Sequence, residues 1–250
     1  MALARPELPL QPGVRHHCLL KGVQCVAHSS PPFHDRTRRR FCKRRRALPG
    51  GDRRVEAEVR YVYPDQVRLP LAFDPARLRA DLAALAPEAW TPHFVPQNHS
   101  GEWDVMPLRA PVGANHPISM IAAHPDARDF VDAPPLYRAP YLRAVLAQFD
   151  CVLRSVRLMR LGPRSCIREH RDLDLCAEDG LARLHLPIVT NPQVRFEVNR
   201  RPVVMSPGEV WYLRLSDPHL VDNAGDTARI HLVIDAEMSP WLAAQLGGKG

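Results

Sequence analysis

Apolar and polar residues alternate in short runs over the second half of the chain, and turn-forming residues separate these runs. Gly162-Pro163, Asn191-Pro192 and Pro207-Gly208 are examples of such turns, because glycine and proline next to polar residues interrupt regular structure. We therefore predict strands near residues 151–161, 165–170, 182–189, 194–198, 202–205, 209–215, 219–222 and 228–235. Short strands at this close spacing are typical of a sandwich or of a closed, double-sheet jelly roll.

The first part of the domain predicts helices beside these strands. Asp74 precedes Pro75, the usual order of a helix N-cap and a first-turn proline, and Leu78 and Leu82 follow at helical spacing. The predicted elements here and at the C-terminus are helices at residues 75–85, 139–149 and 241–246 and a strand at 59–63. Residues 90–117 contain several glycines and prolines and are predicted to be rich in loops. The expected fold class is mainly β with flanking helices.

Charge divides the chain into two parts. Residues 1–54 hold 13 Lys and Arg but three acidic residues, a balance of +10, so the rest has 34 − 13 = 21 basic and 27 − 3 = 24 acidic residues, a balance of −3. Such a basic segment, with eight Lys or Arg in Arg36–Arg46, tends to stay solvated. We interpret residues 1–54 as a basic, disordered extension and 55–250 as the folded domain. A role of the extension as an arm for nucleic acid or an acidic partner is the less favoured alternative, and nucleic acid is not the expected partner of the mildly acidic body.

The sequence gives no sign of a membrane or secreted protein. No apolar run approaches the roughly 20 residues of a membrane-spanning helix, and the N-terminal residues lack the continuous apolar core of a signal peptide. The six cysteines form no Cys-x-x-Cys pair, so a zinc ribbon is unsupported and reduced thiols are expected. We therefore expect a cytoplasmic protein.

The first chemical signal is the triplet His170-Arg171-Asp172. Residues two apart in an extended chain point to the same side, so His170 and Asp172 converge while Arg171 turns away. One imidazole and one carboxylate are two of the three ligands of the facial triad of non-haem iron(II) oxygenases. A second triplet of this form, at residues 124–126, lies in a proline-rich segment and is predicted to be a surface loop.

Two residues with matching positions follow this triplet. His219 comes after the turn Asp217-Pro218 at the start of a predicted strand, which suits a third metal ligand. Arg229 follows ten residues later inside an apolar strand. Because an unpaired buried guanidinium is very costly, Arg229 requires a carboxylate partner, and a co-substrate carboxylate would meet this need through a two-pronged hydrogen bond.

Three strand segments direct two polar side chains each to one side of the predicted sheet. The pairs are His170 and Asp172, Arg183 and His185, and Arg229 and His231. Aliphatic residues fill the opposite side of the second and third segments. One such pair is compatible with an ordinary buried hydrogen-bond network, but three pairs together indicate a polar pocket inside a barrel.

In residues 57–246, and most specifically in 160–235, the chain resembles the aspartyl/asparaginyl β-hydroxylase family. The stretches that carry the resemblance are Ile167-Arg168-Glu169-His170-Arg171-Asp172, Arg183-Leu184-His185-Leu186-Pro187, Pro207-Gly208-Glu209-Val210-Trp211-Tyr212, Pro218-His219-Leu220-Val221-Asp222-Asn223 and Arg229-Ile230-His231-Leu232-Val233-Ile234-Asp235. The resemblance implies a double-stranded β-helix, a cupin-like jelly roll, that binds Fe(II) and uses 2-oxoglutarate and O2 as co-substrates. It also implies a dioxygenase that releases succinate and CO2.

The resemblance assigns roles to individual residues. By position, His170 and His219 match the iron-binding histidines, and Asp172 supplies the acidic ligand that the animal members lack, so the chain is closer to the bacterial branch. Arg229 matches the arginine that holds the distal carboxylate of 2-oxoglutarate. His185 matches a contact of the carboxylate near the metal, and Arg183 an arginine lining the same site.

Three functions remain open at this point. The first is hydroxylation of an aspartyl or asparaginyl residue, or of a free or carrier-linked amino acid. The second is a cupin-like metal enzyme that does not use 2-oxoglutarate, and the third is a non-catalytic binding module. Trp103 and Arg109, before the barrel strands, are candidates for substrate contacts, although a structural role is favoured for each.

Overall fold

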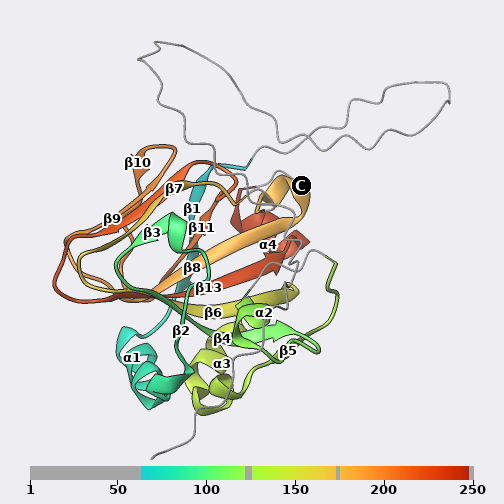
Figure 1. Ribbon diagram of the computed structural model, residues 1–250. Coiled ribbons are helices and arrows are strands. Elements are labelled where there is room, and N and C mark those ends of the chain that lie inside the picture. The colour runs from blue at the N-terminus through green and yellow to red at the C-terminus, as the bar shows by residue number, and fades with distance from the viewer. Residues whose placement is uncertain (1–62, 122–125, 173–174, 248–250) are drawn as a thin grey trace, which may run out of the picture. The chain divides into compact units, whose positions relative to one another are not determined.

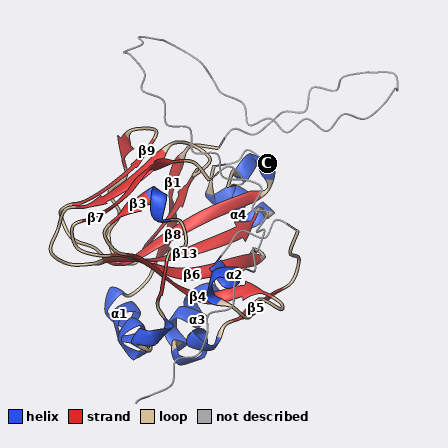
Figure 2. Ribbon diagram, in the orientation of Figure 1, coloured by secondary structure: helices blue, strands red, loops and turns tan. Residues whose placement is uncertain are grey.

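The computed structural model describes residues 63–121, 126–172 and 175–247, which all lie in one compact unit. These residues form two antiparallel β-sheets that pack against each other, with helices against the outer face of the larger sheet (Figures 1 and 2). No helix among the described residues is long and apolar enough to cross a membrane.

The larger sheet has eight strands, and β8 and β13 near its centre carry Arg183, His185, Arg229 and His231. Its order is β1 (Gln66–Ala72), β11 (Glu209–Leu213), β8 (Leu181–Val189), β13 (Arg229–Glu237), β6 (Leu153–Leu161), β4 (Trp103–Pro111) and β2 (Thr91–Pro92), with β5 (Phe130–Asp132) paired to β4. The register aligns Val233 of β13 with Arg157 on β6 and with His185 on β8. Side chains of neighbouring strands therefore meet in rows on each face of the sheet.

The smaller sheet has five strands and carries both candidate histidine ligands. Its order is β10 (Arg201–Pro202), β9 (Val194–Val198), β12 (His219–Asn223), β7 (Ser165–His170) and β3 (His99–Ser100). Strands β7 and β12 are antiparallel neighbours, with His170 directly opposite His219. An apolar cluster that includes Trp103, Ile167 and Phe196 fills part of the space between the two sheets.

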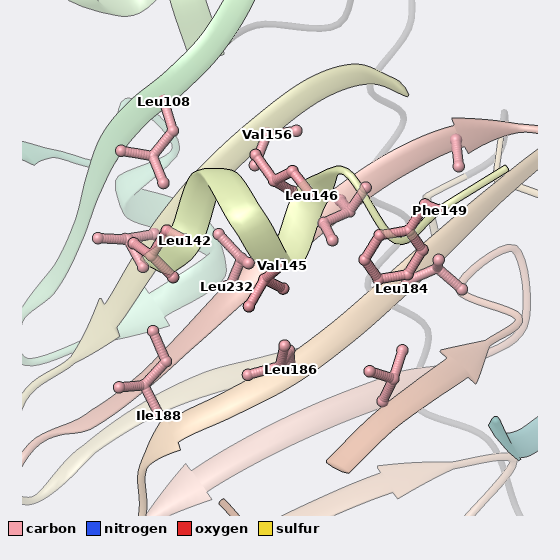
Figure 3. Close-up of a cluster of buried hydrophobic side chains, with 14 of the residues drawn as sticks. Leu108, Leu142, Val145, Leu146, Phe149, Val156, Leu184, Leu186, Ile188 and Leu232 are labelled. Carbon is pink, nitrogen blue, oxygen red and sulfur yellow. The ribbon is translucent and has the colours of Figure 1, made fainter. Parts of the chain in front are cut away.

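Helices α1 (Pro75–Ala84), α3 (Pro140–Leu146) and α4 (Pro240–Gln245) cover the other face of the larger sheet. A further helix, α2 (Pro117–Ile121), lies beside β4, and the short 3-10 turns are η1 (Pro87–Ala89), η2 (Pro96–Asn98), η3 (Pro134–Arg138) and η4 (Ala177–Asp179). Figure 3 shows Leu142 and Val145 of α3 above Leu184, Leu186 and Leu232 of the sheet. These side chains are almost fully buried. Their burial leaves the opposite face of β8 and β13 to polar residues, because side chains alternate along a strand.

The structure confirms the predicted fold class and the strands after residue 150. Seven of the eight predicted segments match β6, β7, β8, β9, β11, β12 and β13 within two residues at each end, and only β10 is shorter and shifted. The three predicted helices correspond to α1, α3 and α4, and the Asp74 side chain caps α1 by accepting hydrogen bonds from the backbone N–H groups of Ala76 and Arg77. The strand predicted at 59–63 and the second His-x-Asp triplet at 124–126 fall largely outside the described residues.

The prediction that residues 90–117 are rich in loops was wrong for β4. This nine-residue strand lies between β6 and β2 in the larger sheet. Most of its residues are buried on both faces, so it lacks the alternation that marks a half-exposed strand. Pro107 also argues against a strand, and the register indeed shifts between Pro107 and Arg109. Strand β1 was missed as well.

Gly208 is required by the backbone at the turn before β11. Its φ is +87°, and a Cβ atom added there would lie 2.1 Å from the carbonyl oxygen of Phe73. We expect Gly208→Ala to lower the free energy of unfolding by roughly 2–5 kcal/mol, because left-handed backbone strain and a forced backbone shift add up. Gly113 is the matched control, since its φ is +84° but nothing lies within 4 Å of an added Cβ.

Urea unfolding of both variants measures the difference. Gly113→Ala should lose only the strain contribution, about 1–2 kcal/mol. Equal losses for the two variants would show that the contact with Phe73 does not constrain the turn.

Candidate active site

Two histidines and one aspartate meet where β7 ends and β12 begins. The ring centroids of His170 and His219 are 4.2 Å apart. Asp172 lies two residues beyond the end of β7, and its backbone N–H donates to the carbonyl of Leu215 over 2.8 Å. One ligand atom from each of the three residues lies within 4.8 Å of the other two. The predicted convergence of His170 and Asp172 is therefore present, although a loop hydrogen bond and not strand pairing holds Asp172.

Backbone carbonyls fix the tautomer of both histidines in the same way. The Nδ1 atom of His170 lies 2.8 Å from the carbonyl oxygen of Arg168, and that of His219 lies 3.0 Å from the carbonyl oxygen of Asp217. A carbonyl oxygen only accepts hydrogen bonds, so each Nδ1 carries the proton and each Nε2 keeps a lone pair for a metal. Burial lowers the pKa of His219 to about 4, which keeps this imidazole neutral at pH 7.

Asp172 is ionised and oriented by a neighbouring arginine. Its Oδ2 atom accepts a hydrogen bond from Arg183 Nη1 over 2.7 Å, and its Oδ1 atom lies 3.7 Å from His170 Nε2. Burial alone would raise the pKa of Asp172, but the Arg183 guanidinium and the two histidines lower it below its usual value. One carboxylate oxygen is thus held by Arg183, and the other faces the histidines.

Arg183 belongs to a buried chain of alternating charges. Its Nε and Nη2 atoms donate to the two oxygens of Asp235 over 2.6 and 2.9 Å, and Arg157 Nη1 donates to the same carboxylate over 3.1 Å. Burial lowers the pKa of Arg183, but Asp235 and Asp172 raise it by more, so the net shift is upward. With two acids and two arginines, this chain is balanced without any ligand.

The donor set suits Fe(II). Two imidazole nitrogens and one carboxylate oxygen on one side of a site are the ligands of the two-histidine, one-carboxylate triad, which leaves positions open for substrates. The neutral imidazole of His219 and the ionised carboxylate of Asp172 are also the protonation states that metal binding requires.

Arg229 is a buried cation without a carboxylate partner among the described residues. Its residue is 2% exposed, no salt bridge to it is found in the described part of the chain, and its Nε atom has no hydrogen-bond partner there. Its Nη2 atom donates to His231 Nδ1 over 2.7 Å, and its guanidinium carbon lies 5.5 Å from the centre of the Phe196 ring. Burial lowers the pKa of Arg229 to about 9, so it remains charged at pH 7 and requires an anion.

His185, on the strand next to that of Arg229, has two ring nitrogens without a hydrogen-bond partner in the described structure. The residue is 4% exposed. Its pKa lies well below the usual value because of burial, with Arg229 and Arg183 lowering it further. A neutral imidazole has one N–H donor and one acceptor, so His185 fits a carboxylate or keto oxygen of a bound ligand.

Comparison with known proteins identifies the family. Residues 74–238 match the model of the aspartyl/asparaginyl β-hydroxylase family, and this span includes every candidate residue above. The chain belongs to this family. The hydroxylase class predicted from the sequence is thereby confirmed at the level of the family.

A curated relative supports the assignment. L-proline cis-4-hydroxylase of Rhizobium meliloti (strain 1021) is 30% identical over 172 residues, which are 68% of this chain and 59% of the relative. The chain thus spans about three fifths of that relative's length.

Solved structures show a looser likeness. A 2OG-Fe(II) oxygenase family oxidoreductase from Burkholderia pseudomallei has 17% identity and a TM-score of 0.46, with 69% of this chain and 85% of that chain covered. A Pseudomonas putida prolyl-4-hydroxylase has 16% identity and a TM-score of 0.42, with 70% and 93% covered. Because both TM-scores are below 0.5, the jelly-roll assignment rests on the strand pairing described above.

The sequence predicted six site residues. In the structure His170, Asp172 and His219 form one group, and Arg183 donates to Asp172. His185 and Arg229 lie on neighbouring strands, and Arg229 contributes to the lowered pKa of His185. Arg183 lies against Asp172 and Asp235, so its predicted contact with 2-oxoglutarate stays a prediction. Arg109 is engaged elsewhere, since it donates to Asp132 over 2.7 Å and to the carbonyl of Leu153 over 3.0 Å.

Arg157 and His93 were missed by the sequence reasoning. Arg157 lies between Val156 and Leu158, which belong to the apolar cluster under the helices. A polar residue between two aliphatic residues of a strand is the same pattern that identified Arg183, so this pattern could have identified Arg157. Asp235 has a structural role, because it forms ion pairs with both Arg157 and Arg183. His93 lies outside any long strand, so no periodic pattern marked it.

His231 is expected to position Arg229, because its Nδ1 atom accepts the 2.7 Å hydrogen bond from Arg229 Nη2. His231→Phe should weaken 2-oxoglutarate binding by about 10-fold or more, the range for losing a hydrogen bond to a charged group. Fe(II) binding should be unchanged, and His231→Asn, which offers an amide oxygen as acceptor, should recover part of the loss. Titration with 2-oxoglutarate measures this, and a loss of Fe(II) binding in His231→Phe would contradict a role confined to Arg229.

Proposed function

We propose that this protein is an Fe(II)- and 2-oxoglutarate-dependent dioxygenase that hydroxylates an amino acid. The observation that carries the proposal is the buried, unpaired Arg229 beside His185, close to a complete His170, Asp172 and His219 set. A metal enzyme that does not use 2-oxoglutarate would have no need of a desolvated cation at this place.

We propose that His170, His219 and Asp172 hold Fe(II) through Nε2, Nε2 and Oδ1. When bound, Fe(II) and 2-oxoglutarate supply the activation of O2, with one oxygen atom entering the substrate as hydroxyl and the other entering succinate as CO2 leaves. The backbone carbonyls of Arg168 and Asp217 hold the proton of each neutral ring on Nδ1 and so leave the Nε2 lone pair for the metal. Arg183 keeps Asp172 charged and turned toward the metal.

The role proposed for Arg229 is to bind the distal carboxylate of 2-oxoglutarate, with His185 against the carboxylate near the metal. Support comes from the free N–H of Arg229, which suits a carboxylate oxygen, and from the neutral state of His185. The charges also match. The chain from Asp172 to Arg157 is balanced, whereas Arg229 is a surplus cation that a carboxylate would neutralise.

For the substrate we propose a free amino acid, with L-proline as the first candidate. The relative named L-proline cis-4-hydroxylase supports this choice over the aspartyl or asparaginyl residue of a peptide, or a carrier-linked amino acid. Because substrate choice depends on residues outside the metal ligands, the likeness supports the substrate class and does not define the compound.

Succinate release tests the proposal. Protein with Fe(II), 2-oxoglutarate and O2 is incubated with each L-amino acid and with Asp- and Asn-containing peptides, and substrate-dependent succinate is quantified. The expected result is succinate formation in excess of the substrate-free rate with one or a few amino acids. If the protein binds the metal but consumes no 2-oxoglutarate under any of these conditions, the proposal is contradicted. A cupin-like metal enzyme that does not use 2-oxoglutarate would then be favoured.

We also propose that residues 1–54 form a basic extension that catalysis does not require. The family match begins only at residue 74, and the basic charge is concentrated before residue 55. A chain that starts at residue 55 is expected to keep the succinate-forming rate of the full chain within about twofold, since surface changes away from the core have small effects. A large loss of rate would assign the extension a direct role.

A further inference from the structure

The side chains of Trp103, at the start of β4, and His93, directly after β2, stack on each other and carry hydrogen-bonding groups without partners in the described structure. The rings of His93 and Trp103 are parallel within 7°, with centroids 3.6 Å apart. The Trp103 Nε1 and His93 Nδ1 atoms are both buried and have no partner in the described structure. Because the two rings lie in parallel planes, these nitrogens cannot satisfy each other.

This pair faces the same interior as the metal ligands. Trp103 is 6% exposed and belongs to the cluster between the two sheets. Across the larger sheet it pairs with Leu161, which pairs in turn with Arg229. The backbone N–H of His93 donates to the carbonyl oxygen of Trp103 over 2.8 Å, which holds His93 beside Trp103. Asp172, Arg157 and Arg183 of the candidate site also influence the pKa of His93.

A purely structural role does not account for the unused groups. An indole N–H is a donor only, and leaving it buried without an acceptor is costly unless a ligand supplies one. A phenylalanine would fill the same space between the sheets without that cost. Burial lowers the pKa of His93 to about 3, with Arg157 as a further cause, so the ring is neutral at pH 7 and its Nδ1 atom has no partner in the described structure.

We infer that Trp103 and His93 form the subsite for the carboxyl group of the amino acid substrate, with the Trp103 indole N–H donating to a carboxylate oxygen. This inference rests on the proposed function. The carboxylate supplies the acceptor that the Trp103 indole N–H lacks. Phe94 and His99 flank the stacked pair at centroid distances of 5.0 Å from His93 and 5.5 Å from Trp103, and so enclose it on both sides.

Anaerobic titration of the Fe(II)- and 2-oxoglutarate-loaded protein with L-proline, and then with the other L-amino acids, tests the inference. The readout is the change in the visible absorption band when the amino acid binds. Trp103→Phe should raise the dissociation constant of the amino acid by about 10- to 100-fold, the range for losing a hydrogen bond to a charged group. The affinity for 2-oxoglutarate should stay at the wild-type value.

The matched control is Trp90→Phe, because Trp90 lies under the Arg160 guanidinium, 4.7 Å from ring centre to Cζ, and its indole is not among the buried groups without a partner. It should bind the amino acid as wild type does. His93→Phe keeps a ring against Trp103 and removes both nitrogens, so it serves as the second variant if Trp103→Phe fails to fold.

The outcomes separate the inference from the proposed function. If wild type gives no band with Fe(II) and 2-oxoglutarate, the proposed function fails and the inference fails with it. If the band forms but Trp103→Phe and His93→Phe both bind the amino acid as wild type does, the inference alone is overturned. It is also overturned if the band forms and no free amino acid perturbs it, because the subsite is assigned to a free carboxylate.

Discussion

Replacement of His219 by alanine is expected to abolish tight Fe(II) binding and turnover together. His219 is 4% exposed and supplies the only ligand from β12, and the space it leaves offers no other imidazole to the metal among the described residues. Loss of a supporting residue around a metal typically costs 10–100-fold in affinity, so loss of a ligand should exceed about 100-fold.

Iron retained per chain after anaerobic desalting measures this effect. His116→Ala is the control, because His116 is exposed at the start of α2 and should retain iron as wild type does. If His219→Ala retains iron at wild-type stoichiometry, the three-residue metal site is wrong.

Arg229→Met is expected to destroy 2-oxoglutarate binding without destabilising the protein. Removing one partner of a buried charge pair costs roughly 2–5 kcal/mol of binding free energy, or about 30- to 5,000-fold in affinity. In the ligand-free protein, however, Arg229 is a desolvated cation with no carboxylate partner among the described residues. Replacing such a charge by an apolar side chain of similar size should leave the free energy of unfolding unchanged or raise it by about 1–4 kcal/mol.

Arg183→Met is the matched comparison. Arg183 lies on the neighbouring strand of the same sheet with its side chain 13% exposed, but it pairs with Asp235 and Asp172. Its loss leaves Asp172 without an arginine and Asp235 with Arg157 alone, and it should lower the free energy of unfolding by up to about 3–5 kcal/mol. Urea unfolding of the ligand-free proteins and titration with 2-oxoglutarate distinguish the two arginines. If Arg229→Met loses as much free energy of unfolding as Arg183→Met, then Arg229 stabilises the fold and does not serve to bind a ligand.

Much of the fold could be predicted because the strands after residue 150 are short, bounded by turns and polar on one face. Arg183, His185 and Arg229 could be predicted together, because each alternates with aliphatic residues along β8 or β13 and so lies on the polar face of its strand. Strand β4 lacked this contrast, because both of its faces are covered and Pro107 falls in its middle.

The candidate site was predictable where its residues lie on strands, and less so elsewhere. Asp172 was found because it follows the end of β7 closely, although the hydrogen bond from its backbone to Leu215 cannot be read from the local sequence. His93 comes to the pocket through the stacking of a loop residue on Trp103, which depends on contacts distant in sequence. The direction of the Arg183 guanidinium toward Asp172 likewise depends on the packing of two separate segments.

Anaerobic addition of Fe(II) and 2-oxoglutarate to the wild-type protein tests the central claim most directly. If His170, Asp172 and His219 hold the metal and Arg229 holds the co-substrate, a weak visible charge-transfer band should appear only when both are present. It should saturate at one equivalent of each per chain and be lost on adding a chelator. Fe(II) binding at one equivalent with no band at any 2-oxoglutarate concentration would contradict the account.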